Sequence, residues 1–424
     1  MATSTKAAEV GLDLTDRELY RNGVPHERLA FLRDEPVWWH PPTEGVSELR
    51  PTGFYVVARH DVVREVSRDP QRFSAFHGSA LRDVPEERQG ESITNSDPPV
   101  QSRFRRLVSL GFTPRMISKL DEMMEGWARR SVDDLAGRDR CEFVGEVAEL
   151  LPLHVIADIV GIPVEERAQV FDDTKAMLRS WDPESGVPFA QYQDAQMRLV
   201  RYAHVLSSAR RDAPEDDVWS QLVAAQLTLD DGTTTELNEI ELDLWFLILS
   251  IAGSETTRNA ISIGLKSLIE HPEEMARLRR EPELMSTAVD EIIRWSSPVL
   301  YHRRTVAAPT ELDGVGLDPD LPIAMFWPLA NRDGRTFPEP DRFDIARTPN
   351  DHVAFGGGGP HYCLGANLAK REVKVMLTEL LSRLDHLELD AGDGVDGERW
   401  SVPGLAVPVA IGLDRLPIRY SLRP

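Results

Sequence analysis

The chain has 424 residues, and 41% of them are apolar, which is enough to bury a substantial hydrophobic core. It carries 48 basic and 70 acidic residues, and the net charge of −22 disfavours binding to nucleic acid or to anionic lipid surfaces. Two cysteines exclude a disulfide framework and are compatible with a reducing cytoplasm. The first residues contain no apolar signal region, and no apolar run is long enough to cross a bilayer, so we expect a cytoplasmic protein without a membrane anchor.

The length alone would allow about three domains of typical size. However, no repeat, linker or low-complexity tract divides the chain. We therefore expect one large domain over residues 1–424, in which residues 1–20 form a flexible N-terminal extension.

The first strand signal lies at residues 53–59, where aromatic and β-branched side chains are frequent. Residues 60–68 predict a helix that ends at an Asp-Pro pair. Two stretches rich in turn-forming residues, 77–92 and 181–188, predict loops.

Most later segments predict helices. Residues 216–229 predict one helix, and after a turn the apolar segment 238–270 predicts a long one that a His-Pro pair stops. Strand signals return at 321–326 and near 407–411, and residues 364–380 predict a further helix. We therefore expect a mainly α fold with a small β-rich region.

Polar residues interrupt the long predicted helix at Ala252-Gly253-Ser254-Glu255-Thr256. Polar groups in such an apolar run need hydrogen-bond partners or water. Gly253 would let a flat ligand approach closely, and Thr256 can bond the backbone carbonyl one turn earlier and open the helix locally. Taken alone, Glu-Thr-Thr is more often typical of a solvated helix face.

Cys363 stands in a loop of residues 355–365, Phe-Gly-Gly-Gly-Gly-Pro-His-Tyr-Cys-Leu-Gly. Four consecutive glycines allow positive φ angles and a close approach of the backbone to a flat ligand. The helix predicted after Cys363 would lower the pKa of the thiol through its first N–H groups and its dipole. A thiolate in this position suits an axial bond to heme iron, whereas Cys141 fits a small buried apolar residue.

This loop, Phe-x-x-Gly…His-x-Cys-x-Gly, resembles the heme-binding signature of the cytochrome P450 family, in its soluble bacterial form. The resemblance implies the P450 fold, with heme b between a long central helix and the cysteine loop, and Cys363 as the iron ligand. By the same resemblance, Phe355, Gly358 and Gly365 would contact the heme as cofactor-binding residues of this loop. Seven residues separate Phe355 from Cys363, one more than is usual, and we expect a slightly wider loop that keeps the ligand.

Matched positions imply the roles of other residues. Glu255 and Thr256 correspond to the family's acid–alcohol pair, so Thr256 would hydrogen-bond dioxygen and Glu255 would relay protons from solvent. Gly253 would let the heme come close. Glu291, Arg294 and Arg342 correspond to a charge-assisted network behind the heme loop, which is structural and not catalytic.

Cations at matched positions would bind the heme propionates: Arg105, Arg304 and His361. Gln101 replaces the family's usual histidine one turn before Arg105, and its amide can still donate a hydrogen bond. Arg303 is adjacent to Arg304, and Arg106 is adjacent to Arg105. The sequence alone does not decide which arginine of each pair binds a propionate.

Two cysteines cannot hold an iron–sulfur cluster, so a separate ferredoxin and its NAD(P)H-dependent reductase are expected to supply electrons. Four basic residues on two helices are expected to receive an acidic ferredoxin: Arg103, Arg106, Lys370 and Arg371. The predicted loops 77–92 and 181–188 match the family's substrate lid. Family position also suggests apolar substrate contacts, for which core packing is an equal explanation: Ala252, Val299, Leu300, Val409 and Ala410.

The runs around residues 297–305 and 355–369 are similar to actinobacterial members that oxidise sterols and methyl-branched lipids, and natural-product tailoring enzymes share much of this pattern. We therefore expect a monooxygenase that hydroxylates a hydrophobic small molecule with O2. One alternative is an oxidative coupling or ring-forming enzyme of the same fold. An alternative of another class is a heme-binding sensor, in which Glu255 and Thr256 would have no purpose.

Overall fold

The computed structural model describes residues 11–43, 53–180, 182, 185–390, 397–403 and 408–423. The chain divides into two compact units. We call the first, made of Met1–Pro98, Ser262–Ala366 and Glu398–Asp414, the sheet unit. The second, made of Pro99–Ile261, Asn367–Gly397 and Arg415–Pro424, is the helical unit. The helix α8 (Glu239–Glu270) contributes residues to both.

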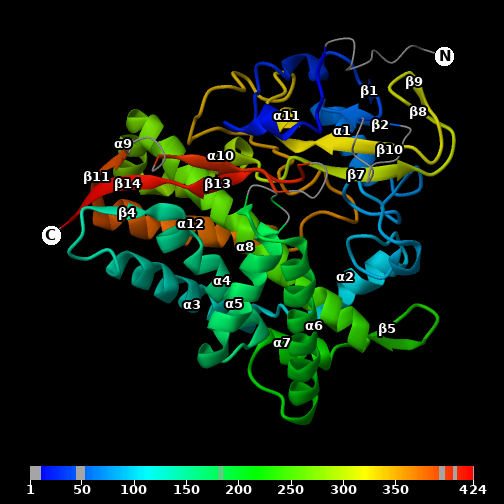
Figure 1. Cartoon of the computed structure of the whole chain (residues 1–424), viewed down its shortest axis with the longest axis horizontal. Helices are drawn as coiled ribbons and strands as arrows, with labels where there is room; N and C mark the ends of the chain where they lie inside the picture. The colour runs from blue at the N-terminus through cyan, green and yellow to red at the C-terminus, as the bar shows by residue number, and fades with distance from the viewer. Residues whose placement is uncertain are drawn as a thin grey trace. The chain divides into compact units, whose positions relative to one another are not determined.

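A five-stranded sheet in the order β1-β2-β10-β7-β3 forms the centre of the sheet unit (Figure 1). Strand β10 runs parallel to β2 and antiparallel to β7. Along β2, Phe54 and Val56 pack in one apolar cluster, whereas Tyr55 and Val57 pack in another. Both faces of the sheet are therefore covered, which explains the uninterrupted apolar run. The strands are β1 (Trp38–His40), β2 (Phe54–Val57), β3 (Phe73–Ser74), β7 (Tyr301–Val306) and β10 (Pro322–Phe326).

Short helices and two small sheets complete the sheet unit. The helices are α1 (His60–Arg68), α9 (Pro272–Arg280), α10 (Met285–Ser296) and α11 (Trp327–Ala330). The small sheets pair β8 (Thr310–Leu312) with β9 (Val315–Leu317), and β12 (Arg399–Ser401) with β13 (Gly412–Arg415).

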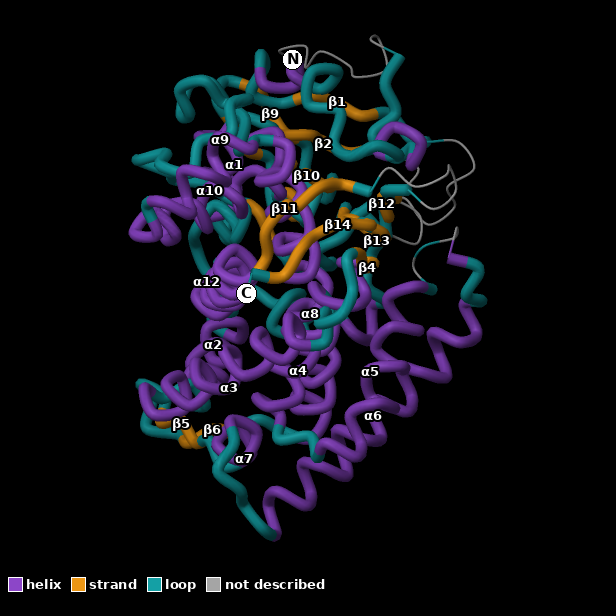
Figure 2. Tube along the Cα trace, turned by 90° about the vertical axis from the view of Figure 1, so that its left-hand side faces the viewer, coloured by secondary structure: helices purple, strands orange, loops and turns teal. Residues whose placement is uncertain are grey.

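Helices dominate the helical unit, where α5 and α6 run alongside each other (Figure 2). The start of α8 is fixed by a capping box, in which the Glu241 amide donates to Asn238 Oδ1 and the Asn238 amide donates to Glu241 Oε2, both at 2.9 Å. The helices of this unit besides α8 are α2 (Val100–Leu110), α3 (Pro114–Asp133), α4 (Leu150–Val160), α5 (Val164–Arg179), α6 (Phe189–Asp212), α7 (Val218–Val223) and α12 (Ala366–Arg383). Its strands are β4 (Arg140–Glu142), β5 (Gln226–Thr228), β6 (Thr234–Glu236), β11 (Leu384–Leu389) and β14 (Pro417–Leu422).

Most predicted elements are confirmed, namely β2, α1, α8, β10 and α12. The helix predicted over 216–229 is wrong beyond α7, because Gln226–Thr228 pairs as β5 with the threonine-rich β6. Gly232, with φ +82, makes the tight turn between these strands.

The strand expected near 407–411 is reduced to a single bridge between Ala410 and Val299, and Val407 lies outside the described residues. Within the predicted N-terminal extension, residues 11–20 are packed: Leu14 and Tyr20 are buried in the core of the sheet unit. Residues 1–10 lie outside the described residues. In the predicted loop 181–188, residues 181, 183 and 184 lie outside them as well.

Within the described ranges, no single helix has the length and apolar composition needed to span a membrane.

Candidate functional site

The cysteine loop of the sheet unit leads directly into α12. Gly356, Gly358 and Gly359 have φ angles of +97, +93 and +80, in the region that favours glycine. The amide of Cys363 donates a hydrogen bond to the Phe355 carbonyl at 3.0 Å, which closes the loop. The Cys363 side chain is exposed, three residues before α12 begins. The sequence therefore places a thiol at a helix start, as predicted.

The glycine run packs tightly against α1. The Ser67 hydroxyl donates to the Gly358 carbonyl at 2.8 Å, and Arg68 Nε donates to the Gly357 carbonyl at 3.0 Å. A Cβ on Gly359 would lie 2.6 Å from the Ser67 carbonyl oxygen. The extra residue of this loop is thus accommodated by close contact with α1, which the sequence did not indicate.

Replacing Gly359 by alanine is expected to lower the free energy of unfolding by about 1–3 kcal/mol, because the new methyl group meets backbone atoms of α1 at a positive φ. Urea unfolding followed by circular dichroism measures this change. Gly334→Ala is the matched control, since its new Cβ would meet its nearest neighbour, Pro340 Cγ, only at 4.0 Å. Equal stability of the two variants would contradict the tight contact.

A buried ion network holds the segment before this loop. Glu291 and Arg294 are both fully buried on α10, and Arg294 Nε and Nη2 each donate to the carboxylate at 2.8 Å. The third predicted member is wrong: Arg342 is exposed, and its side chain pairs with Glu339. Arg347 takes that place, with Nε 3.1 Å from Glu291 Oε2. The sequence contained two arginines in this segment, and only tertiary packing distinguishes them.

Arg304 is one of the buried cations of the sheet unit. Its side chain is 4% exposed, and its Nη1 donates to the Arg303 carbonyl at 2.7 Å. Burial lowers the pKa of Arg304 to about 10, and the Asp97 carboxylate offsets this shift only in part. A buried guanidinium of this kind fits the carboxylates of a ligand such as heme. His361 is partly exposed within the cysteine loop.

Helix α8 carries the predicted acid–alcohol pair within the helical unit. Thr256 Oγ1 donates to the Ala252 carbonyl at 2.8 Å, as predicted, and Ser254 Oγ makes the same kind of bond to Ser250. The predicted local opening is not seen, because the helix is continuous from Glu239 to Glu270. Each hydroxyl therefore has a backbone partner, and these hydrogen bonds do not interrupt the helix.

Glu255 lies in a chain of charged side chains. Arg258 Nη2 is 3.4 Å from Glu255 Oε1, and Arg258 Nη1 is 3.9 Å from Glu149 Oε1. Glu149 in turn pairs with Lys175 at 2.7 Å. Glu255 is 12% exposed and Lys175 is 38% exposed, so these contacts lead from an enclosed carboxylate toward solvent.

Gly253 has a packing role that the sequence analysis did not predict. A Cβ at this position would lie 2.5 Å from Ile156 Cδ1 of α4, so the absence of a side chain lets Ile156 pack closely against α8. Ala252, by contrast, is exposed, although it lies in the middle of a largely buried helix. Ile248 and Leu244, one and two turns earlier, are partly exposed as well. Their regular spacing of four residues is the signal that could have identified this apolar face.

On α2, Gln101 is 1% exposed and Arg105 is partly exposed, and their spacing of four puts them on one helix face.

In the sheet unit, the predicted substrate residues come together in pairs: Val299 bridges Ala410, and the Leu300 amide donates to the Val409 carbonyl at 2.8 Å. Leu300 itself is 1% exposed within the core, so core packing is the better interpretation for this residue.

Comparisons with known proteins indicate the family of this chain. The family model described as "Cytochrome P450" matches residues 47–409. The Rhodococcus jostii protein named steroid C26-monooxygenase is 36% identical over 385 residues, which cover 89% of this chain and 79% of that protein. The methyl-branched lipid omega-hydroxylase of Mycobacterium tuberculosis is 36% identical over 381 residues and 88% of both chains.

A solved structure is similar over nearly the whole length. Cytochrome P450 CYP268A2 of Mycobacterium marinum, in complex with pseudoionone, has a TM-score of 0.83 and 34% identity, and covers 98% of this chain and 97% of its own. Members of this family are heme enzymes. The exposed thiol in a glycine loop, the buried Glu291–Arg294 pair and these matches together show that the chain belongs to the cytochrome P450 family, as a heme-thiolate monooxygenase.

Proposed function

We propose that this enzyme hydroxylates a steroid or a methyl-branched lipid. The observation that carries the substrate class is the similarity over nearly nine-tenths of the chain to proteins named for these two substrates. The partly exposed apolar face of Leu244, Ile248 and Ala252 supports it, because an apolar ligand would cover side chains that otherwise remain in contact with water.

The cofactor assignments form part of this proposal. Cys363 would bind the heme iron as a thiolate, and Arg304 and His361 of the sheet unit would bind the propionates. Arg105 and Gln101 of the helical unit would contribute further hydrogen bonds from adjacent turns of α2. When bound, heme supplies the activation of dioxygen.

Thr256 and Glu255 would manage protons in this reaction. Because the Thr256 hydroxyl donates its proton to the Ala252 carbonyl, its oxygen is oriented to accept a hydrogen bond. Glu255 lies one residue earlier, and Arg258, Glu149 and Lys175 link it toward solvent. This arrangement supports a relay in which Glu255 exchanges protons with solvent and Thr256 orients the group that receives them.

Replacing Thr256 by alanine is expected to divert most reducing equivalents into hydrogen peroxide, because no hydroxyl remains to orient the group that receives the protons. The measurement is the ratio of product to NAD(P)H consumed, with peroxide quantified in parallel. Ser254→Ala is the matched control, since Ser254 makes the same bond to the helix but is buried, 5% exposed. Unchanged coupling in the Thr256 variant would contradict the relay.

A ferredoxin would bind the helical unit through fewer cations than the sequence suggested. Arg103 is held by Glu241 at 2.7 Å, and Arg371 is paired with Asp121, so both charges are already compensated. Arg106, by contrast, is exposed on α2. We therefore assign the main attraction for an acidic partner to Arg106, with Lys370 as a second candidate.

The Arg106→Glu variant is expected to slow reduction by ferredoxin roughly tenfold or more at low ionic strength, and added salt should diminish the difference. Stopped-flow reduction under carbon monoxide measures the rate. Arg201→Glu, an equal charge change at an exposed site on α6, is the control. Equal reduction rates for both variants would show that the ferredoxin binds a surface that does not include Arg106.

The substrate proposal is tested by titrating the ferric holoenzyme with a sterol, a methyl-branched fatty alcohol and a cyclic peptide. A shift from low to high spin with one of the lipids, followed by a hydroxylated product in mass spectrometry, is the expected result. A spin shift with the cyclic peptide alone would overturn the lipid assignment and favour the oxidative coupling alternative.

A further inference from the structure

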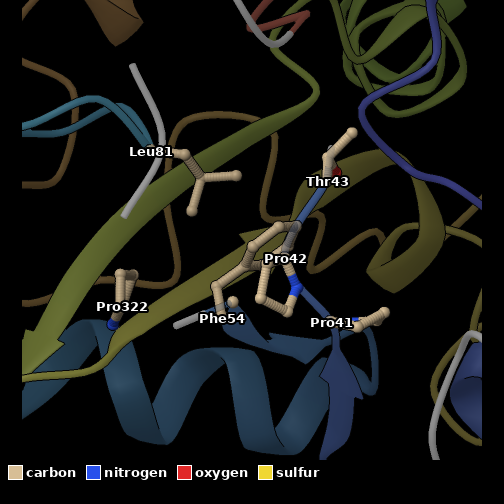
Figure 3. A pocket seen from close by; sticks show the side chains of 7 residues that line it. Pro41, Pro42, Thr43, Phe54, Leu81 and Pro322 are labelled. Carbon is tan, nitrogen blue, oxygen red and sulfur yellow. The ribbon is translucent and has the colours of Figure 1, made fainter. Parts of the chain in front are cut away.

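Strand β7 presents different side chains to the two faces of the central sheet, because side chains alternate along a strand. Tyr301 packs in the apolar cluster that also holds Phe54 and Leu81, and the latter two line a small hollow on that face (Figure 3). Arg303 belongs to the same face, and its Nη1 lies 2.5 Å from Asp83 Oδ1. The charge of Arg303 is therefore compensated within the protein.

His302 and Arg304 belong to the opposite face, together with Val306. Val306 packs there in a second apolar cluster, with valines of α1 and with Val353, which lies just before the cysteine loop. The same helix α1 holds the glycine run of that loop through two hydrogen bonds. The face that carries His302 and Arg304 is therefore the one that α1 connects to the predicted iron ligand.

Trp327 fixes the position of the proton on the His302 ring. The indole N–H of Trp327 can only donate, and it donates to His302 Nδ1 at 2.9 Å. Nδ1 is therefore unprotonated, and the proton of the neutral ring lies on Nε2. Trp327 is 2% exposed and packs in the second cluster, so this partner is held in place. His302 thus presents a fixed N–H donor at Nε2.

His302 is also kept from becoming a cation. A second proton, on Nδ1, would point at the indole N–H of Trp327, and the nearby Arg304 guanidinium repels a further positive charge. Burial and, to a smaller extent, Arg304 lower the pKa of His302 to about 4. The ring is still partly exposed, and among the described residues none accepts a hydrogen bond from its Nε2. A neutral donor therefore lies beside a buried cation.

Arg304 is the cation next to this donor. The Asp97 carboxylate acts on Arg304 but offsets the effect of burial on its pKa only in part. Asp97 already accepts hydrogen bonds from the Ser74 hydroxyl and, at 2.9 Å, from the Ala75 amide. Arg304 and His302 thus offer a guanidinium and a neutral N–H group on one face of the sheet, and this combination fits a single carboxylate.

We propose that His302 is a further heme-binding residue, which donates its Nε2 proton in a hydrogen bond to the propionate that Arg304 binds. Trp327 acts on this contact as a positioning residue, because it keeps the proton on Nε2. The donor is neutral, so it strengthens the binding of a carboxylate without burying a second positive charge. That the carboxylate belongs to heme rests on the proposed function.

The rate of heme loss tests the donor. The ferric holoenzyme is mixed with an excess of heme-free myoglobin, and heme transfer is followed by absorbance. His302→Asn keeps an acceptor for Trp327 but has no N–H group at the Nε2 position, and it is expected to lose heme roughly tenfold faster or more, because a hydrogen bond to a charged group is removed. His302→Gln, whose longer amide reaches the Nε2 position, should restore part of the retention. His204→Asn, at an exposed position of α6, is the control and should lose heme at the wild-type rate.

The tautomer is measured separately by nitrogen-15 NMR of the diamagnetic carbon monoxide complex. The wild type is expected to show His302 with its proton on Nε2 at neutral pH. In Trp327→Phe the constraint on Nδ1 is lost, so the tautomer with its proton on Nδ1 should appear and the pKa of His302 should rise toward its ordinary value. A purely structural role of Trp327 would leave the tautomer unchanged.

A wild-type rate of heme loss in His302→Asn would overturn the proposal, and so would equal acceleration in His204→Asn or His302→Gln. A proton on Nδ1 in the wild type would overturn it as well. If His302→Asn retains heme but binds a lipid carboxylate more weakly, the donor serves the substrate and the heme contact is refuted. A wild type without the thiolate spectrum would refute the heme assignment itself, whereas NMR of that protein would still show whether Trp327 fixes the tautomer.

Discussion

Replacement of Cys363 by serine is expected to abolish the strongly red-shifted Soret band of the ferrous carbon monoxide complex. A hydroxyl group donates far less electron density to iron than a thiolate, and the position of this band depends on the sulfur ligand. Monooxygenase turnover should fall below detection for the same reason. The measurement is the absorbance spectrum of the reduced protein under carbon monoxide, together with the heme content of the purified variant.

Cys141→Ala is the matched control for this prediction. Cys141 is 5% exposed, and burial raises the pKa of its thiol to about 12, so it remains protonated and unsuited to bind iron. The control variant should keep the wild-type spectrum. A red-shifted band that survives in Cys363→Ser would refute the assigned ligand.

The second large effect is expected at Glu291. Its carboxylate accepts hydrogen bonds from Arg294, from Arg347 at 3.1 Å, from Asn350 at 3.2 Å and from the Asp344 amide at 2.9 Å. Glu291→Ala would leave these donors, including the fully buried Arg294 guanidinium, without their anion. Breaking a buried pair in this way costs about 3–5 kcal/mol, a large part of the roughly 5–15 kcal/mol that stabilises a typical protein.

The variant is therefore expected to accumulate poorly or to unfold well below the wild-type temperature, in the presence and absence of heme. Differential scanning calorimetry and the soluble yield measure the effect. Glu339→Gln is the control, because the Glu339–Arg342 pair is largely exposed and contributes little. A Glu291 variant as stable as this control would show that the network is dispensable.

Local sequence signals predicted the elements well where one physical cause dominated. The long apolar segment of α8 and the β-branched run of β2 were identified because burial on all sides requires uninterrupted apolar residues. The helix predicted over residues 216–229 failed beyond α7, because the pairing of β5 with β6 depends on a turn at Gly232 and on a partner strand further along the chain.

The residues of the candidate site also fall into two groups, those that the local sequence predicts and those that depend on distant contacts. The sequence by itself determined the residues that chemistry requires locally: a thiol after four glycines and before a helix, and a threonine one turn after Ala252. It could not choose between Arg342 and Arg347, and it could not predict the close contact of Ile156 with Gly253. Only the tertiary structure decided these points, because each depends on which distant side chain fills a given space, and contacts between segments far apart in the chain leave no periodic pattern within either segment.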